Sequence, residues 1–125
     1  MASRDPKDLS DMMYFKWSEW DKAMQSNGID YILTSTRRTK ADQEALFAQG
    51  RTKPGKTVTW TLNSKHLTGD AFDFVIMNNG KCDWSMCLTE EWKTAVELGK
   101  ALGLSQVVDS RGRIKEFAHL QLGET

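Results

Sequence analysis

The chain has 125 residues, 39% of them apolar, and its 17 basic and 17 acidic residues cancel. This length suits one domain, residues 1–125, with a core that needs no disulfide or structural metal to form. The charges form no basic arm or acidic tail, which argues against a nucleic-acid partner. No stretch approaches the roughly 20 apolar residues of a membrane span, so we expect no membrane insertion.

The N-terminal sequence MASRDPKDLSDMM has no apolar run of signal-peptide length. We therefore expect the protein to stay in the cytoplasm in which it is made unless something else releases it. Cys82 and Cys87 are separated by four residues, and no second cysteine pair exists to complete a zinc site. We expect two reduced thiols, since a disulfide would require an oxidising compartment.

The first half of the chain predicts a helix, a strand and a second helix. Apolar residues at spacings of four, three and four predict an amphipathic helix over about residues 8–25, ended by Asn27-Gly28; they are Met13, Trp17, Trp20 and Met24. Residues 29–36 (IDYILTST) are rich in β-branched and aromatic side chains and predict a strand. Thr39 is a suitable N-cap for a helix over residues 40–49, which Gly50 ends.

The second half predicts a loop, a strand, a helix and a last strand. Residues 51–60 contain a Pro-Gly turn. Residues 70–77 alternate as a strand does, and Asn78-Asn79-Gly80 follows as a turn. Thr89 caps a helix over residues 90–103, with Trp92, Val96 and Leu102 as core candidates, and residues 117–122 predict a short strand. This order predicts an α+β fold, a small single domain whose antiparallel sheet has flanking helices, and we expect a monomer.

The two histidines of the chain, His66 and His119, invite a metal-site interpretation. A catalytic zinc takes three protein ligands and leaves a fourth position for water, and His66, Asp73 and His119 would supply two imidazoles and a carboxylate. Gly69 lets the backbone bend so that His66 can turn back toward Asp73. Histidines and strand aspartates are also often structural residues satisfied by hydrogen bonds or salt bridges, and the residue pattern by itself leaves both interpretations open.

A zinc site of this kind also needs a group that moves protons. Glu116 lies three residues before His119, and could approach a water at the metal without being a ligand if the chain bends there. Gly112, a short distance upstream, would allow such an irregular path.

Three sequence motifs resemble those of a known enzyme family. SKHLTGDAFDF (64–74) resembles the S-x-H-x-x-G-x-A-x-D signature of the VanY-like zinc D-alanyl-D-alanine carboxypeptidases and L-alanyl-D-glutamate endopeptidases. EFAHLQL (116–122) resembles the E-x-x-H signature of the same family. RTKADQEALFAQGRTKPGKTVT, which begins at Arg38, is similar to a segment of the phage endolysin branch. The resemblance is strong over residues 34–74 and partial over the C-terminal dozen.

The resemblance implies roles for individual residues. His66, Asp73 and His119 match the zinc ligands, and Glu116 matches the catalytic base. Three further residues match positions near the substrate: Arg38, expected to hold a substrate carboxylate or stabilise the oxyanion; Gln43, expected to pack or hydrogen-bond; and Ser64, expected to orient the turn. A nucleophilic role for Ser64 is not expected, because the only bases in view are the proposed ligands.

The implied function is a phage endolysin that hydrolyses the L-Ala-D-Glu bond of the peptidoglycan stem peptide, with a hedgehog/DD-peptidase-like fold. Zinc would polarise the scissile carbonyl and activate a water, while Glu116 accepts the proton and delivers it to the leaving amine. Arg38 would share the oxyanion charge. Such an enzyme would be made in the host cytoplasm and act on the periplasmic cell wall after release.

One region departs from the family pattern. Many relatives have a Trp-Gly-Gly-rich stretch before the second motif, whereas this chain reads GLSQVVDSRGRIKEFAH, with Ala118 in place of the usual proline. Two alternatives therefore stay open: a D-Ala-D-Ala carboxypeptidase that uses the same site, and a catalytically silent, zinc-bearing peptidoglycan-binding module.

Overall fold

The computed structural model describes residues 3–52, 54–55, 65–84, 89–108 and 114–123; for residues 107–108 and 114–117 it describes the backbone only. Its helices and strands follow one another in an α+β order. The elements are η1 (Pro6–Asp8), α1 (Asp11–Ser26), β1 (Tyr31–Ser35), α2 (Lys40–Ala48), η2 (Lys65–Leu67), β2 (Ala71–Asn78), β3 (Lys81–Asp83), α3 (Glu90–Ala101), β4 (Leu104–Val108) and β5 (Ile114–Leu122), where η marks a 3-10 helix.

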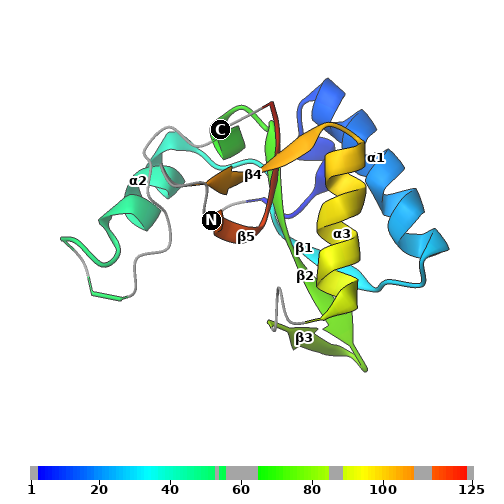
Figure 1. Ribbon diagram of the computed structural model, residues 1–125. Coiled ribbons are helices and arrows are strands. Elements are labelled where there is room, and N and C mark those ends of the chain that lie inside the picture. The colour runs from blue at the N-terminus through cyan, green and yellow to red at the C-terminus, as the bar shows by residue number, and fades with distance from the viewer. Residues whose placement is uncertain (1–2, 53, 56–64, 85–88, 109–113, 124–125) are drawn as a thin grey trace.

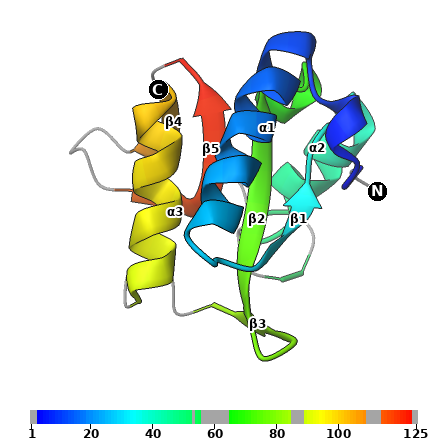
Figure 2. The ribbon, with the colours of Figure 1, turned by 90° about the vertical axis from the view of Figure 1, so that its right-hand side faces the viewer.

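The strands form one sheet in the order β1-β2-β5-β4, with β3 paired to β2, and every pairing is antiparallel. Helices α1 and α3 lie together against one face of the sheet, and α2 lies on the opposite side (Figures 1 and 2). The predicted α+β fold, an antiparallel sheet with flanking helices, is confirmed. No helix in the described part of the chain has the length and apolar character to cross a membrane.

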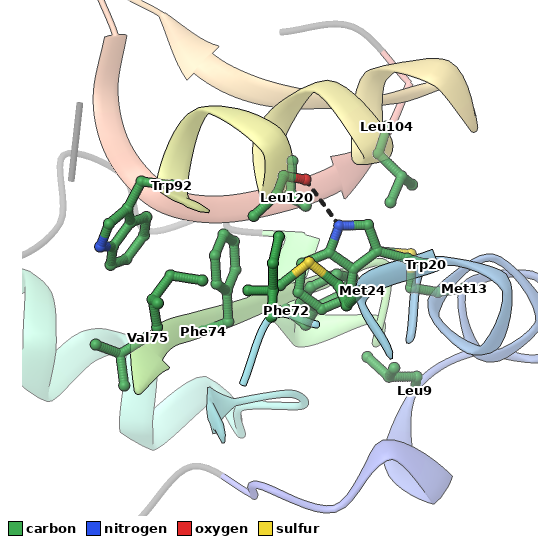
Figure 3. Close-up of a cluster of buried hydrophobic side chains, with 13 residues drawn as sticks. Leu9, Met13, Trp20, Met24, Phe72, Phe74, Val75, Trp92, Leu104 and Leu120 are labelled. Atoms are coloured by element: carbon green, nitrogen blue, oxygen red, sulfur yellow. Dashed lines mark hydrogen bonds between the residues drawn. The ribbon is translucent and has the colours of Figure 1, made fainter. Parts of the chain in front are cut away.

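The hydrophobic core lies between the sheet and the α1–α3 pair (Figure 3). Trp20 of α1 is fully buried, with its ring centroid 5.0 Å from those of both Phe72 and Phe74 of β2. Its indole Nε1–H donates to the Ala95 carbonyl of α3 at 2.8 Å, so the one polar atom of this large side chain is satisfied inside the core. Trp92 closes the cluster from α3. Because Phe72 and Phe74 point into this core, the residue between them must point to the other face.

The predicted helix ends agree with the structure to within one residue except at the start of α1 and at the end of α3, which ends at Ala101 rather than at residue 103 because Leu102 is its C-cap. Helix α1 begins three residues later than predicted, because Ser10 is its N-cap and residues 6–8 form the separate turn η1. It ends as predicted, with Gly28 at φ 67°. Thr39 and Thr89 cap α2 and α3 as predicted, and Trp17 is only partly buried, at the edge of the core.

Two strands were not predicted, and one is longer than predicted. β3 is a three-residue strand formed because Asn79 and Gly80, at φ 54° and 76°, turn the chain back along β2. β4 follows α3 directly and pairs with β5, which begins at Ile114 rather than 117. Cys82 is an exposed free thiol in β3. Cys87, most of the predicted loop over residues 51–60, and Gly112 lie outside the described residues.

Candidate functional site

Three side chains from separate elements meet on the face of the sheet opposite the aromatic core. His66 comes from η2, Asp73 from β2 and His119 from β5. Asp73 Oδ1 lies 3.1 Å from His66 Nε2 and 3.0 Å from His119 Nδ1, and the two ring nitrogens are 3.2 Å apart. Both histidines are buried. The sequence prediction named these three residues as a set, and the structure brings them together as a group that could hold a metal ion.

The pairing of strands β2 and β5 positions two of the three side chains, Asp73 and His119. Asp73 and His119 are direct partners across the antiparallel β2–β5 pair, so their side chains project side by side from the same face. The aromatic residues on either side of Asp73 point to the opposite face, which leaves the carboxylate facing the α2 side.

A tight turn at Gly69 positions the third side chain, His66. After η2 the chain turns at Gly69, whose φ of 76° favours glycine. A Cβ there would lie 2.7 Å from the Ser10 backbone nitrogen, so the turn also needs the space that glycine leaves. The Arg38 N–H donates to the His66 carbonyl at 2.9 Å, which holds η2 against the residues that precede α2. Gly69 thus has the role at the bend that the sequence predicted.

The hydrogen bond on the outer side of each imidazole determines which ring nitrogen carries the proton and which presents a lone pair to Asp73. His66 Nδ1–H donates to the Thr36 carbonyl at 2.6 Å, and a carbonyl can only accept, so in the neutral ring Nε2 presents its lone pair to Asp73. His119 Nε2–H donates to Gln121 Oε1 at 2.8 Å, which leaves Nδ1 as the inward lone pair. Three acceptor atoms therefore converge, and a cation between them would relieve their mutual repulsion.

The spacing of the three atoms suits a small metal ion. Donors held about 2.0–2.1 Å from a tetrahedral zinc are roughly 3.3 Å from one another, close to the observed separations. Burial by itself raises the pKa of the Asp73 carboxyl, but when the imidazoles carry protons on their inward nitrogens, the charge of His66 and the hydrogen bonds from His119 and His66 outweigh burial and hold the pKa well below its ordinary value. A cation bound to the inward lone pairs would supply positive charge in place of those protons. The carboxylate thus stays ionised, as a metal ligand must be.

Arg38 and Gln43 extend the group on the α2 side. Arg38 Nη2 donates to Asp73 Oδ2 at 3.0 Å, and Nη1 donates to Gln43 Oε1 at 3.0 Å. Gln43 is fully buried in α2, and the Arg38 side chain is 12% exposed. Both residues therefore adjoin the group, and Gln43, which contacts Arg38, is closed off from solvent. The substrate-binding roles expected of Arg38 and Gln43 stay predictions.

The backbone at Glu116 departs from regular strand pairing. Ser105 pairs with Gln121 and Val107 with Glu116, so two steps along β4 correspond to five along β5. This extra length lies between Glu116 and Gln121, and an irregular path here is the condition under which the sequence allowed the Glu116 carboxylate to approach a water at the metal. Strict alternation therefore does not force Glu116 and His119 onto opposite faces. The Glu116 side chain and Ser64 lie outside the described part of the structure.

A cleft of about 550 Å³ opens beside Asp73. Strand β1, the segment after it and helix α2 supply its walls, and its lining residues are Arg4, Thr34, Ser35, Arg38, Asp42, Ala45, Leu46 and Asp73. Sequence reasoning did not identify Ser35, Thr36 or Gln121. The sequence could have indicated Gln121 as a neighbour of His119, because it lies two residues after His119 and therefore on the same face of the strand.

Comparison with known proteins adds family membership to this geometry. Residues 16–115 match the family described as phage L-alanyl-D-glutamate peptidase. The chain is 31% identical to the peptidoglycan L-alanyl-D-glutamate endopeptidase CwlK of Bacillus subtilis, over 94% of this chain and 75% of that protein. It is 33% identical to the L-alanyl-D-glutamate peptidase of Listeria phage A118, over 84% of this chain but 32% of the phage protein.

Solved structures share the fold at lower identity. The L-Ala D-Glu endopeptidase ChiX of Serratia marcescens superposes with a TM-score of 0.67 at 18% identity, over 98% of this chain and 89% of ChiX. The D,D-pentapeptidase VanY, solved as an E175A mutant in complex with Zn(II), gives a TM-score of 0.67 at 16% identity, over 91% of this chain and 72% of VanY. Sequence match and fold agree with the motifs, and the chain belongs to the phage L-alanyl-D-glutamate peptidase family.

Proposed function

We propose that this chain is a zinc-dependent endopeptidase that hydrolyses the L-Ala-D-Glu bond of the peptidoglycan stem peptide. The observation that supports this most is the convergence of His66 Nε2, Asp73 Oδ1 and His119 Nδ1, three acceptor atoms within 3.2 Å of one another. Two imidazoles and one carboxylate favour zinc over the harder cations calcium and magnesium, which prefer oxygen ligands. Three protein ligands also leave a coordination position open, as in catalytic zinc sites.

The residues around the proposed zinc ligands would transfer protons, stabilise charge and position the site. When bound, zinc supplies a Lewis acid and lowers the pKa of a water at the open position. The Glu116 carboxylate accepts a proton from the attacking water and returns it to the departing D-Glu nitrogen. Arg38 holds Asp73 through Nη2 and lines the adjoining cleft, where its positive charge would share the charge of the developing oxyanion. Gln43 fixes the Arg38 guanidinium, and Ser64 orients the turn before His66.

The decisive experiment digests purified sacculi with the protein, with and without a zinc chelator, and identifies the new termini by mass spectrometry. We expect zinc-dependent release of peptides with new D-Glu amino termini. Release of free D-Ala alone would instead indicate a D-Ala-D-Ala carboxypeptidase, and the endopeptidase proposal would fail.

A substitution at Glu116 distinguishes an active enzyme from a catalytically silent, zinc-bearing binding module. Glu116→Gln should keep zinc bound at about one ion per chain and lose most cleavage, since general acid–base groups contribute roughly 10²–10⁴-fold to rate. His66→Ala is the matched variant that should lose both zinc and cleavage. If wild-type protein binds sacculi and zinc but cleaves nothing, the silent-module alternative is correct.

The same proposal places the protein, as a monomer, at the bacterial cell wall. Its relatives in Bacillus and in phage are named for peptidoglycan or its L-alanyl-D-glutamate bond. Purified protein added to chloroform-treated Gram-negative cells should reduce their turbidity, and the Glu116→Gln variant should not. Equal loss of turbidity with both proteins would show that the lysis does not come from this site.

A further inference from the structure

Helix η2, which carries His66, needs contacts outside itself to hold its place beside β5. It is a single three-residue 3-10 turn, and such turns have poor internal hydrogen-bond geometry. Asp73 and His119 are fixed against each other by strand pairing, whereas η2 is not a strand and has no such pairing. Its hydrogen bonds to Thr36 and Arg38 tie it to the segment before α2. The 3.2 Å between the two histidine rings therefore depends on what joins η2 to β5.

The Lys65 side chain makes this connection. Its part-buried Nζ donates to the Leu122 carbonyl at the end of β5. The Leu122 N–H donates to the Asp70 carbonyl at 2.9 Å, and the Asp70 N–H donates to the Lys65 carbonyl at 2.9 Å. The three hydrogen bonds form a closed ring that locks the end of β5 to η2 and to the turn after it. The bond from the ammonium is charge-assisted, and such bonds are stronger than neutral ones.

The end of β5 leaves space for the Lys65 ammonium. Gly123 has a φ of 77°, which favours glycine, and a Cβ at this position would lie 3.0 Å from Lys65 Nζ. Lys65 directly precedes His66, and Leu122 lies three residues after His119. The contact between Lys65 and Leu122 therefore fixes two backbone segments that each carry a proposed zinc ligand.

We propose that Lys65 is a positioning residue of the zinc site, which sets the separation of His66 from His119 by bonding η2 to the end of β5. This inference rests on the proposed function and deepens it. The S-x-H motif leaves the position of Lys65 unspecified, so the family resemblance assigns it no role. Lys65 acts through the two backbones and is not itself a ligand.

Zinc affinity, measured by competition with a chromophoric chelator, tests this role. Lys65→Met keeps the length of the side chain and removes the donor, and it should lower zinc affinity roughly 10-fold, as loss of a partner outside the ligand set commonly does. Lys65→Arg keeps a charged donor and should recover most of the affinity. Lys81→Met removes the same charge from an exposed position in β3 and should bind zinc as wild type does.

The spectrum of the cobalt-substituted protein separates positioning from a merely structural role. Co²⁺ accepts the same ligands as zinc, and its visible absorption depends on their geometry. At saturating Co²⁺ the bands of Lys65→Met should differ from those of wild type, and those of Lys65→Arg should not. The Tm of the metal-free proteins is measured alongside. If Lys65→Met lowers this Tm but keeps wild-type zinc affinity and cobalt bands, Lys65 only stabilises the fold and the inference is overturned.

The failure of this inference differs from that of the proposed function. If wild-type protein binds zinc but cleaves no sacculi, the endopeptidase proposal is wrong, and the zinc affinities of the Lys65 variants still test the positioning role. If wild-type protein cleaves sacculi and Lys65→Met binds zinc as tightly as wild type, the enzyme stands and the role of Lys65 is wrong.

Discussion

Arg38 donates to the Asp73 oxygen that does not face the histidines. The Nη2–Oδ2 distance is 3.0 Å, while Oδ1 of the same carboxylate lies 3.0–3.1 Å from both imidazoles. One carboxylate thus joins the proposed metal site to the cationic residue of the cleft. Both the orientation of Asp73 and the charge beside it depend on a guanidinium that Gln43 holds from the other side.

Replacing Arg38 by lysine should weaken zinc binding even though the charge is kept. Lysine has no planar fork and cannot contact Asp73 and Gln43 at once. Loss of such an outer partner commonly lowers metal affinity or activity by about 10–100-fold. Competition with a chromophoric chelator measures the zinc affinity. Arg37→Lys is the neighbouring control, since the Arg37 guanidinium contacts the Asp8 and Thr68 carbonyls instead. Equal weakening in both variants would contradict a specific role for Arg38.

Gln121→Leu should lower zinc affinity by a similar factor, about 10–100-fold. Without the Gln121 acceptor, His119 loses the hydrogen bond that keeps its proton on Nε2 and its lone pair on Nδ1. Gln121→Glu restores an acceptor and should recover affinity, because a carboxylate in this position increases the basicity of the imidazole. The same chelator competition measures the zinc affinity of both variants. If Gln121→Glu binds zinc as weakly as Gln121→Leu, Gln121 does not act as the hydrogen-bond acceptor that orients His119.

Tyr31 should make the fold sensitive to alkaline pH. Burial, the hydrogen bond to Asp21 and the negative charge of Asp21 raise the pKa of the Tyr31 hydroxyl well above its usual value, and a smaller contribution from Trp17 opposes this. Because the folded state favours the protonated phenol, the stabilisation is present below about pH 10 and is lost as pH rises above it. The free energy of unfolding in urea, measured between about pH 9 and pH 11, should therefore fall with pH.

Two phenylalanine variants test the assignment to Tyr31. Tyr31→Phe should flatten the alkaline decline, because the ionisable group is removed. Tyr14→Phe should leave the decline as in wild type, since the Tyr14 side chain is 40% exposed on α1. If the decline persists in Tyr31→Phe, another group is responsible.

Gly69→Ala should be more destabilising than Gly28→Ala. Both glycines have positive φ, 76° and 67°, and either substitution should cost more than about 1 kcal/mol of unfolding free energy. Only at Gly69 would the added Cβ also clash, at 2.7 Å from the Ser10 nitrogen, whereas nothing lies within 4 Å at Gly28. Urea midpoints compare the stabilities. Zinc affinity should fall only for Gly69→Ala, since the turn at Gly69 positions His66. An equal fall in zinc affinity for Gly28→Ala would contradict this role of the turn.

The sequence by itself determined the local structure and the chemistry of the site. Helix α2 is defined by Thr39 at one end and Gly50 just beyond the other, and such caps act over a few residues. The alternation around Asp73 placed a carboxylate among aromatic residues, and the spacing of His66, Asp73, Glu116 and His119 carried the family resemblance. These signals are local, so no tertiary contact was needed to read them.

Only the tertiary structure decided which atoms meet. His66 and His119 are 53 residues apart, and their ring nitrogens lie 3.2 Å apart because the turn at Gly69 and the β2–β5 register bring η2 and β5 together. The position of Ser35 depends on one extra residue in β1, and a single-residue shift in register moves a side chain to the other face of a sheet. Register is set by packing between segments distant in the chain. The short motifs therefore predicted the proposed ligands through their family resemblance, but they did not predict the Gln121 acceptor or the position of Ser35 on the same side of the sheet.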